Sequence, residues 1–235
     1  DRQPLAGQIA VISGGAGGIG SAVCRAFERE GAASVVVDMN GDRAEQVAAE
    51  IVSRGGNALA VETEVTSESS VNAAVERAVA EFGRVNFLVH CAGNNIKAPV
   101  LDLAAEQWDL VLNTHLTGAF LFCKAVGKQM VKQGDGGRVV FMSSVAATAP
   151  APERGAYTPA KAGLIGLAGV LSLEWSRYNI NVNAVCPGMV MTPMTKMVYE
   201  REPELQAQRL KRMPAGREAR PEEVSDLVVF LCSEK

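Results

Sequence analysis

Short apolar runs alternate with longer amphipathic stretches from one end of the chain to the other. The runs are rich in Val, Ile and Ala and are too short for typical helices, so they predict buried strands. The predicted strands cover residues 8–13, 34–38, 58–62, 85–90, 138–143 and 180–185. Between the runs, apolar residues recur at helical spacing. The predicted helices cover residues 18–30, 42–54, 68–82, 106–132, 156–178 and 221–231.

The regular alternation of strand and helix predicts an α/β fold. Parallel strands joined by helical crossovers produce this order, and the predicted strands are almost wholly apolar, as in a sheet that helices cover on both faces. No linker interrupts the pattern. We therefore predict a single doubly wound, Rossmann-like domain over residues 1–235, with a central parallel sheet and helices on both faces. The Met-, Pro- and charge-rich segment at about 189–217 is predicted to form a lid over the substrate.

A glycine-rich turn follows the first predicted strand. Ser13–Gly20 reads SGGAGGIG and contains two overlapping patterns, GxGxxG and GxxxGxG, directly before a predicted helix. In doubly wound folds, glycines at this place let the backbone approach a pyrophosphate, and the helix N-terminus supplies free N–H groups and partial positive charge. The turn therefore predicts a dinucleotide-binding site at the carboxyl edge of the sheet.

Asp38 ends the second predicted strand and bears on which nicotinamide dinucleotide is bound. Its carboxylate can accept hydrogen bonds from the adenosine ribose hydroxyls and would repel a 2′-phosphate. Neither Met39 nor Gly17 provides a cation for that phosphate. The sequence therefore predicts NAD rather than NADP as the cofactor.

Tyr157 and Lys161 lie four positions apart on a predicted helix, so one face of that helix presents both. The Lys161 ammonium would stabilise a phenolate and lower the pKa of Tyr157, and such a phenol can exchange a proton with a substrate oxygen. Ser144 follows the fifth predicted strand and can steady a carbonyl or alkoxide, with Ser143 as the adjacent alternative. This set predicts proton transfer at an alcohol or carbonyl oxygen.

Composition narrows the class of partner and the compartment. The 235 residues carry a formal net charge of −3, with a pI of about 5.6 and a mean hydropathy of +0.09, which argues against nucleic acid or a membrane as partner. The five cysteines are scattered without a CxxC pair and are expected to be small buried residues in a reducing compartment. The two histidines form no HExxH motif, so no metal is expected. The first residues are polar, unlike a signal peptide, and we expect a cytoplasmic location.

Together these motifs resemble the short-chain dehydrogenase/reductase family, in its single-domain form with a Tyr-x-x-x-Lys motif. The resemblance covers nearly the whole chain, and the thirteen-residue step from Ser144 to Tyr157 favours Ser144 over Ser143. It implies that Tyr157 is the general acid/base, that Lys161 lowers its pKa and binds the nicotinamide ribose, and that Ser144 orients the substrate oxygen. The implied cofactor contacts are Gly14, Gly18, Ile19, Gly20, Asp38, Ala92, Gly93, Tyr157, Lys161, Pro187, Gly188, Val190 and Thr192.

Three places depart from the family pattern. His90 and Cys91 stand where the family usually has Asn-Asn. Glu64 replaces an Asp that often holds the adenine amino group, and we include it and the neighbouring Val65 in the predicted cofactor site. His115 replaces the Asn that holds a helix kink and a water in a proton relay to the lysine, and is kept as a candidate catalytic residue. His115 either substitutes for that Asn through its donor and acceptor nitrogens, slows the relay, or serves as a core histidine.

The resemblance implies an NAD-dependent oxidoreductase that moves a hydride between nicotinamide and a secondary alcohol or ketone. A polyol, sugar or small alcohol is the first expectation, because NAD suits oxidation; a 3-oxoacyl thioester and a steroid or other ring alcohol are the alternatives. A protein that binds NAD and has lost its chemistry is a further alternative, against which the intact Ser144, Tyr157 and Lys161 argue. Glu153 and Arg154 directly precede Tyr157 and are placed to border the substrate mouth.

The family also implies a homotetramer or homodimer, assembled through the two long helices predicted at 106–132 and 156–178. Apolar residues of the second helix, such as Leu164 and Val170, would serve that interface or the core. Family members usually continue past the last helix into a seventh strand, so we expect further residues after Lys235. The first residue is not Met, which suggests an upstream stretch as well.

Overall fold

The centre of the molecule is a sheet of six parallel strands. The computed structural model describes residues 3–211 and 213–234. The strands are β1 Ile9–Ser13, β2 Ala33–Asp38, β3 Ala58–Glu62, β4 Phe87–His90, β5 Gly137–Met142 and β6 Ile180–Val185. Their order is β3-β2-β1-β4-β5-β6, so the direction of winding reverses between β1 and β4. In doubly wound sheets a ligand binds at the carboxyl ends of the strands beside that reversal.

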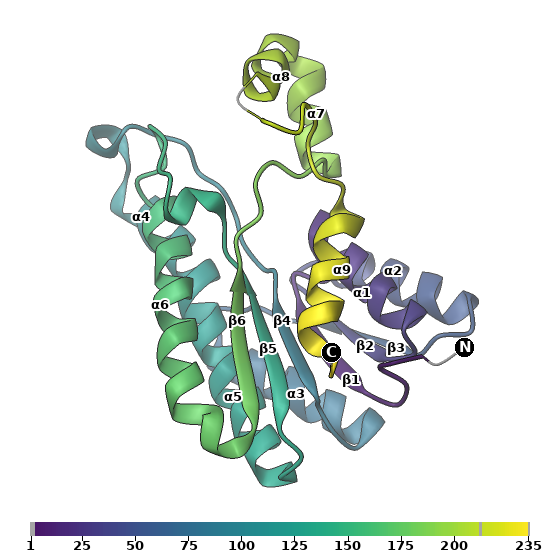
Figure 1. The fold of residues 1–235 in the computed structure, drawn as a ribbon. Coiled ribbons are helices and arrows are strands. Elements are labelled where there is room, and N and C mark those ends of the chain that lie inside the picture. The colour runs from purple at the N-terminus through teal and green to yellow at the C-terminus, as the bar shows by residue number, and fades with distance from the viewer. Residues whose placement is uncertain (1–2, 212, 235) are drawn as a thin grey trace.

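Helices cover both faces of the sheet (Figure 1). One face carries α1 Gly18–Arg29, α2 Gly41–Ser53 and α9 Pro221–Cys232. The other carries α3 Glu68–Phe82, α4 Ala105–Leu112, α5 Gly118–Gln133 and α6 Tyr157–Trp175. Two more helices, α7 Pro193–Arg201 and α8 Pro203–Leu210, stand beyond the carboxyl ends of the strands. The doubly wound α/β fold predicted from the sequence is confirmed.

Strand side chains fill two hydrophobic cores, one on each face of the sheet. Val11 and Leu88 belong to the core under α3, α5 and α6, whereas Ile12 and Val89 belong to the core under α1, α2 and α9. All four side chains are fully buried. Each such burial contributes about 1.5–3 kcal/mol. Successive strand residues are buried on opposite faces, which is why the strands are continuous apolar runs in the sequence.

The helix predicted over residues 106–132 is interrupted in its middle. A single helical segment, Ala105–Gln133, contains a π turn at Asn113–Thr117 between α4 and α5. Within the described residues this is the one helix long and apolar enough to cross a membrane, and half of its most apolar window is buried in the domain, as in a core helix of a globular protein. Single π turns inside α-helices occur frequently at functional sites. This turn carries His115.

The segment after β6 leaves the sheet and returns to it. Val190 forms a parallel bridge with Ala219, and the Met191 N–H donates to the Ala219 carbonyl at 2.9 Å. α7 and α8 lie between these two ends and project from the carboxyl edge of the sheet (Figure 1). Thr192 caps α7, since its hydroxyl accepts from the Thr195 N–H at 3.2 Å. The segment stands where the sequence predicts a lid, and its role as a lid stays a prediction.

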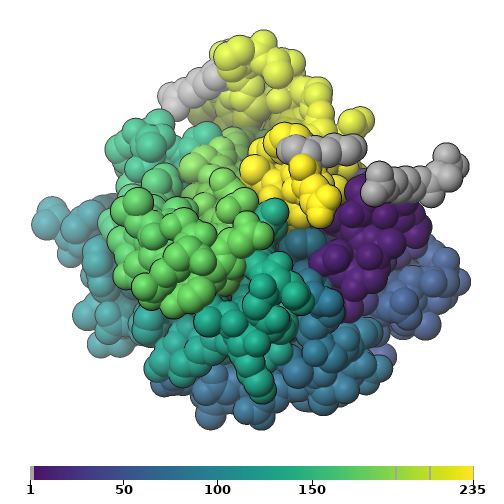
Figure 2. All heavy atoms as spheres, turned by 60° about the horizontal axis from the view of Figure 1, so that its bottom comes forward, coloured from purple at the N-terminus to yellow at the C-terminus, as the bar shows by residue number. Residues whose placement is uncertain are grey.

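The last helix completes the core on the α1 side. α9 packs against α1, and its Val228 is fully buried. Figure 2 views the molecule from the end opposite the lid and shows α9 (yellow) between the N-terminal segment (purple) and the C-terminal part of α6 (green). The two ends of the described chain therefore lie on the same side of the sheet, away from its carboxyl edge.

Candidate active site

The glycine turn after β1 has the geometry that a pyrophosphate requires. Gly14 has a φ of +65°, and a Cβ at this residue would lie 2.6 Å from the Ala92 nitrogen. A Cβ at Gly20 would overlap the Gly14 carbonyl oxygen. α1 begins after Gly17, which has no side chain that could cap the first N–H groups of the helix. No acidic residue lies in the first turn of α1. These N–H groups and the positive end of the helix dipole can therefore bind an anion.

Gly18 and Thr192, two cofactor residues predicted from distant parts of the sequence, lie against each other. A Cβ on Gly18 would lie 2.6 Å from the Thr192 Cβ. Ile19 is half-buried and packs on the core beneath the glycine turn. The start of the lid segment therefore contacts the N-terminus of α1, beside the glycine turn that would hold a pyrophosphate.

The chain between β6 and the lid follows the same edge of the sheet. The Pro187 carbonyl accepts from the Val145 N–H at 3.1 Å, which ties this stretch to the loop after β5. Gly188 is exposed, and Val190 is buried where it pairs with Ala219. This stretch therefore runs close to the loop after β5, which carries Ser144. A contact with the nicotinamide of a bound cofactor requires this position for Pro187, Gly188 and Val190.

Asp38 lies at the carboxyl end of β2, beside the glycine turn. Its Oδ2 accepts from the Ala16 N–H and its Oδ1 accepts from the Asn40 N–H, each at 3.1 Å. These bonds hold the half-buried carboxylate between the turn and α2, where an adenosine ribose would lie. Met39 follows with its side chain 73% exposed and brings no positive charge. The glycine turn, the uncapped α1 terminus and Asp38 together fit a nicotinamide dinucleotide.

The other residues predicted on the adenosine side differ in their surroundings. The Glu64 carboxylate accepts from the Thr66 N–H at 3.0 Å and from its hydroxyl at 2.9 Å, so Oε1 is bonded within its own loop. Val65 is buried and belongs to the core under α5. Ala92 is buried and lies against Gly14, where a Cβ would come within 2.6 Å of the Ala92 nitrogen. Cofactor contacts by Glu64 and Val65 stay predictions.

Tyr157 and Lys161 are brought together on one face of α6. Tyr157 is the first residue of the helix, and the Lys161 Nζ lies 5.5 Å from the centroid of its ring. Lys161 is only 5% exposed, and its Nζ donates to the Met142 carbonyl at 2.6 Å. Burial lowers the pKa of the Lys161 ammonium to about 8. A desolvated ammonium this close to the ring can stabilise a phenolate at Tyr157.

The two neighbouring serines after β5 have different environments. Ser143 is buried, and its hydroxyl donates to the Lys161 carbonyl at 2.8 Å, which fixes the loop to α6. Ser144 is half-buried, and its Oγ accepts from the Ala146 N–H at 3.1 Å, which leaves the hydroxyl proton free to donate. The structure therefore supports the choice of Ser144 as the residue that faces a substrate oxygen.

His115, in the π turn, lies beside Tyr157. Its ring meets the Tyr157 ring edge-on, with 5.5 Å between centroids. Its Nε2 lies 2.7 Å from the Asn94 carbonyl oxygen and 3.1 Å from the Asn94 nitrogen, so both backbone groups of Asn94 face this one ring nitrogen. Nδ1 is buried and has no partner among the described residues. Burial, with a smaller effect of the Lys161 charge, lowers the pKa of His115 to about 3, so the ring is neutral.

His90 connects the π turn to the glycine turn. Its Nε2 donates to the His115 carbonyl at 3.1 Å, and its Nδ1 therefore accepts from the Ser13 hydroxyl at 2.7 Å. Ser13 is the last residue of β1, directly before the glycines. A π turn shifts the helical hydrogen-bond register, and His90 supplies a donor to a carbonyl of that turn.

Comparison with known proteins shows the family of this chain. A family model described as enoyl-(acyl carrier protein) reductase matches residues 14–235. D-threitol dehydrogenase from Mycolicibacterium smegmatis is 37% identical over 230 residues, 98% of this chain and 87% of that protein. 3-Oxoacyl-(acyl-carrier-protein) reductase from Thermotoga maritima is 34% identical over 231 residues, 98% of this chain and 92% of that protein. The chain belongs to the short-chain dehydrogenase/reductase family.

A solved structure agrees with this membership. NAD⁺-bound xylitol dehydrogenase superposes with a TM-score of 0.90 at 32% identity, over 97% of this chain and 92% of that one. Short-chain dehydrogenase/reductases are oxidoreductases that act on alcohols and ketones with a nicotinamide cofactor, NAD or NADP. The fold, the glycine turn and the Tyr157–Lys161 pair of this chain agree with that activity.

Three residues that support this short-chain dehydrogenase/reductase site were not predicted from the sequence. Ser13 holds His90, the Asn94 backbone holds His115, and the Met142 carbonyl holds Lys161. Asn94 and Met142 act here through backbone carbonyl oxygens, which no pattern of residue types reveals. For Ser13, the position of a hydroxyl residue directly before the glycine turn was the available signal.

Proposed function

We propose that this short-chain dehydrogenase/reductase uses NAD and transfers a hydride between nicotinamide and a secondary alcohol or ketone, with a polyol, sugar or small alcohol as substrate. The proposal depends on the joint placement of Ser144, Tyr157 and Lys161 at the carboxyl edge of the sheet, beside the glycine turn. The relatives named for D-threitol and xylitol support the polyol class. Asp38 supports NAD, because its carboxylate would repel a 2′-phosphate.

In the oxidising direction, Ser144, Tyr157 and Lys161 have separate roles. The Ser144 hydroxyl donates a hydrogen bond to the substrate oxygen, and the Tyr157 phenolate accepts the hydroxyl proton. The Lys161 ammonium stabilises that phenolate through its charge. A bound nicotinamide supplies the acceptor for the hydride that leaves the carbinol carbon. The C–H electron pair and the O–H proton thus leave the alcohol separately, and a ketone remains.

Nicotinamide absorbance tests the proposal directly, with NAD and NADP in parallel on polyols, simple secondary alcohols, steroids and 3-oxoacyl thioesters. We expect NAD-dependent turnover of a polyol or small alcohol. Tyr157→Phe should lower kcat by about 10²–10⁴-fold, because the proton acceptor is lost, while the glycine turn and Asp38 still bind NAD. Tyr178→Phe, at the far end of α6, is the matched control and should keep wild-type turnover.

Three results would contradict this proposal. Equal turnover by the wild type and Tyr157→Phe would show that the phenol takes no part in the reaction. A higher kcat/KM with NADP than with NAD would show that Asp38 does not set the cofactor. Binding of NAD with no Tyr157-dependent turnover on any class would favour a protein that has lost its chemistry.

A 3-oxoacyl thioester reductase is the second candidate function. The family model described as enoyl-(acyl carrier protein) reductase and the Thermotoga maritima relative favour it. The same catalytic residues serve the reverse direction, since the Tyr157 phenol can donate a proton to the reduced carbonyl oxygen. Oxidation of NADH by a 3-oxoacyl thioester, with no turnover of polyols, would select this function.

We also propose that the protein assembles as a homotetramer or homodimer and works in the cytoplasm. α6 carries apolar side chains on its exposed face, which supports assembly through this helix and α5. All five cysteines are free thiols, which suits a reducing compartment. Cys24, Cys123 and Cys232 are buried as expected, whereas Cys186 is exposed, because it follows β6 at the open edge of the sheet.

A further inference from the structure

Arg154 is held next to the catalytic tyrosine by the loop that follows β4. Its backbone forms a parallel bridge with Ala98, and the Ala98 N–H donates to the Glu153 carbonyl at 3.3 Å. The Arg154 Nη1 also donates to the Asn95 Oδ1. Glu153 has a φ of 63°, in the left-handed region that few residues other than glycine adopt. Such backbone strain clusters at functional sites, and here it lies directly before the arginine.

The guanidinium of Arg154 lies against the Tyr157 ring. Its Cζ is 5.5 Å from the ring centroid, the same distance as the Lys161 Nζ. The side chain is half-buried, and burial is the main reason that the pKa of Arg154 lies below its usual range. A partly desolvated guanidinium beside a reacting group is stabilised by an anionic partner.

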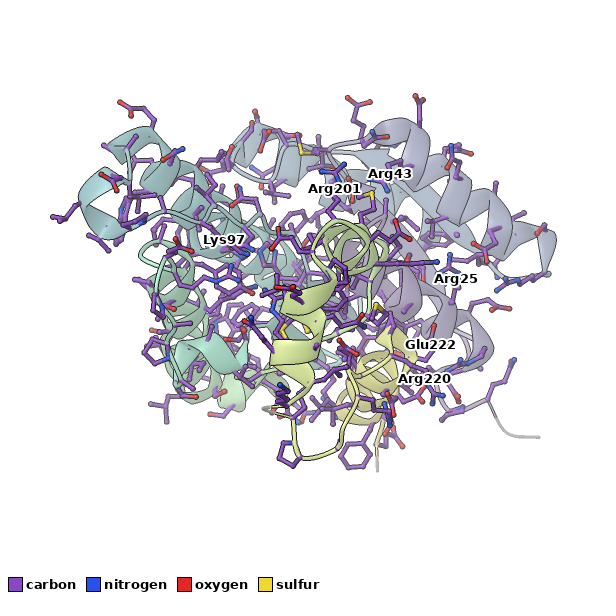
Figure 3. The ribbon with its side chains drawn as sticks, turned by 90° about the horizontal axis from the view of Figure 1, so that it is seen from above. Arg25, Arg43, Lys97, Arg201, Arg220 and Glu222 are labelled. Atoms are coloured by element: carbon purple, nitrogen blue, oxygen red, sulfur yellow. The ribbon has the colours of Figure 1, made fainter. Side chains whose placement is uncertain are left out.

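No ion pair joins Arg154 to a carboxylate among the described residues, where every ion pair joins other side chains. The exposed neighbour Glu153 raises the pKa of Arg154, but less than burial lowers it. The nearby cation Arg209, on α8, lowers the pKa of Arg154 further and lies 5.6 Å from the Tyr199 ring centroid. Figure 3 looks down on this edge and shows Lys97, from the loop that also carries Asn95, on the α4 side of the lid helices. Two cations, Arg154 and Lys161, therefore lie against the Tyr157 ring, and Arg209 adds positive charge near Arg154.

We propose that Arg154 binds an anionic group of the substrate, a carboxylate or a phosphate, while Ser144 and Tyr157 act on a hydroxyl of the same molecule. A guanidinium offers parallel N–H donors that match either group in a two-pronged contact. The inference rests on the proposed function and narrows its substrate class to hydroxy acids or phosphorylated alcohols. Arg209 adds positive charge from the lid segment on the same side.

Turnover of matched substrate pairs tests this role. Threitol is compared with threonate, xylitol with xylonate, and glycerol with glycerol 3-phosphate, so each pair differs in its anionic group. We expect the wild type to prefer the anionic member of a pair by at least ten-fold in kcat/KM. Preference for threonate or xylonate identifies a carboxylate as the bound group, and preference for glycerol 3-phosphate identifies a phosphate. Arg154→Gln should lose at least ten-fold on the anionic member and change less than three-fold on the neutral one, whereas Arg154→Lys should recover part of the loss.

Arg177→Gln is the matched control. Arg177 also lies over a tyrosine ring, that of Tyr178 at 4.8 Å, and its removal changes the net charge equally at the far end of α6. It should keep the preference for the anionic substrate. An equal loss on both members of a pair in Arg154→Gln would show that Arg154 acts on Tyr157 instead, and the proposal would be wrong. Equal kcat/KM for both members in the wild type would also overturn it.

A binding measurement separates this inference from the proposed function. Calorimetry on the NAD-loaded Tyr157→Phe protein measures the Kd for threonate, xylonate and glycerol 3-phosphate without any turnover. Binding that weakens at least ten-fold when Arg154→Gln is added supports the anion site, even where no substrate turns over and the proposed function fails. No detectable binding of any of these anions, together with turnover of neutral polyols, overturns the anion site alone.

Discussion

Burial determines the charge of the two histidines near the active site. His90 and His115 are 1% and 2% exposed, and desolvation lowers the pKa of each to about 3. Each ring is therefore neutral; His90 donates its Nε2–H to the His115 carbonyl, and the His115 Nε2 lies against the Asn94 backbone. A neutral ring cannot serve as a cationic acid at neutral pH, but its second nitrogen remains an acceptor.

This neutral state predicts a loss of stability in acid. The pKa of His115 is about 3 in the folded chain and near 6.5 when unfolded, so between these values the unfolded chain binds the additional proton. The contribution of neutral His115 to the free energy of unfolding is complete above pH 6.5 and is lost as the pH falls toward 3. Between pH 7.5 and 5.0 the free energy of unfolding of His115→Asn should therefore fall by about 2 kcal/mol less than that of the wild type.

Urea denaturation at the two pH values measures this difference. Carboxylates that titrate in the same range are present in both proteins, so their effects cancel in the comparison. An identical acid loss in the two proteins would show that His115 is protonated in the folded chain.

At the scale of elements, the π turn and the loop after β4 are fitted to each other through Gly93. A Cβ at Gly93 would overlap the His115 Cε1 and would lie 2.7 Å from its Nδ1. The imidazole therefore occupies the space that any other residue at position 93 would need. The bulk of His115, in place of a smaller Asn, makes this contact a feature of the present chain.

A double-mutant cycle tests this steric coupling. Gly93→Ala alone should lower the free energy of unfolding by about 1–3 kcal/mol through overpacking. In the His115→Ala background the same change should cost less than about 0.5 kcal/mol, because the ring is gone. Gly166→Ala is the control, since a Cβ on Gly166 of α6 meets nothing within 4 Å and should stabilise the helix. Equal losses of unfolding free energy on Gly93→Ala in both backgrounds would show that the His115 ring is not what excludes a side chain at position 93.

At the scale of the whole molecule, α6 exposes more apolar surface than a monomer needs. Val170 is half-exposed and Leu173 is 84% exposed, while Leu164 on the opposite side of the helix is fully buried. A helix that is apolar all round is normally covered on every side. The sheet covers one side, so we expect a second copy of the chain to cover the other.

Leu173→Glu should therefore weaken assembly, because it places a charge in an apolar contact. Light scattering across a dilution series should show a dimer or tetramer for the wild type and a shift toward monomer for the variant. Leu101→Glu is the control, since Leu101 is 98% exposed and lies in the short helix Val100–Asp102 rather than on α6. A wild-type protein that stays monomeric at every concentration would remove the assembly proposal.

The local sequence was enough to predict the strands and the helices that cover the sheet. Periodicity alone located the strands, because a residue in a sheet buried on both faces must be apolar whatever its neighbours. The glycine turn and the Tyr157–Lys161 spacing are also local, since they depend on backbone geometry and on one helical turn. The helix at 106–132 was predicted without a break, because none of the five residues of the π turn is Pro or Gly.

Contacts between distant segments were decided by the tertiary structure alone. The sequence left open whether His115 is a core histidine, and packing placed it edge-on to Tyr157, with its buried Nδ1 unpartnered within the part of the chain that the structure describes. The link from Ser13 through His90 to the π turn joins residues far apart in the chain, and its partner atom on the turn is a backbone carbonyl. Burial lowered the pKa values of His90, His115 and Lys161, and burial is a property of the packed molecule rather than of any one segment.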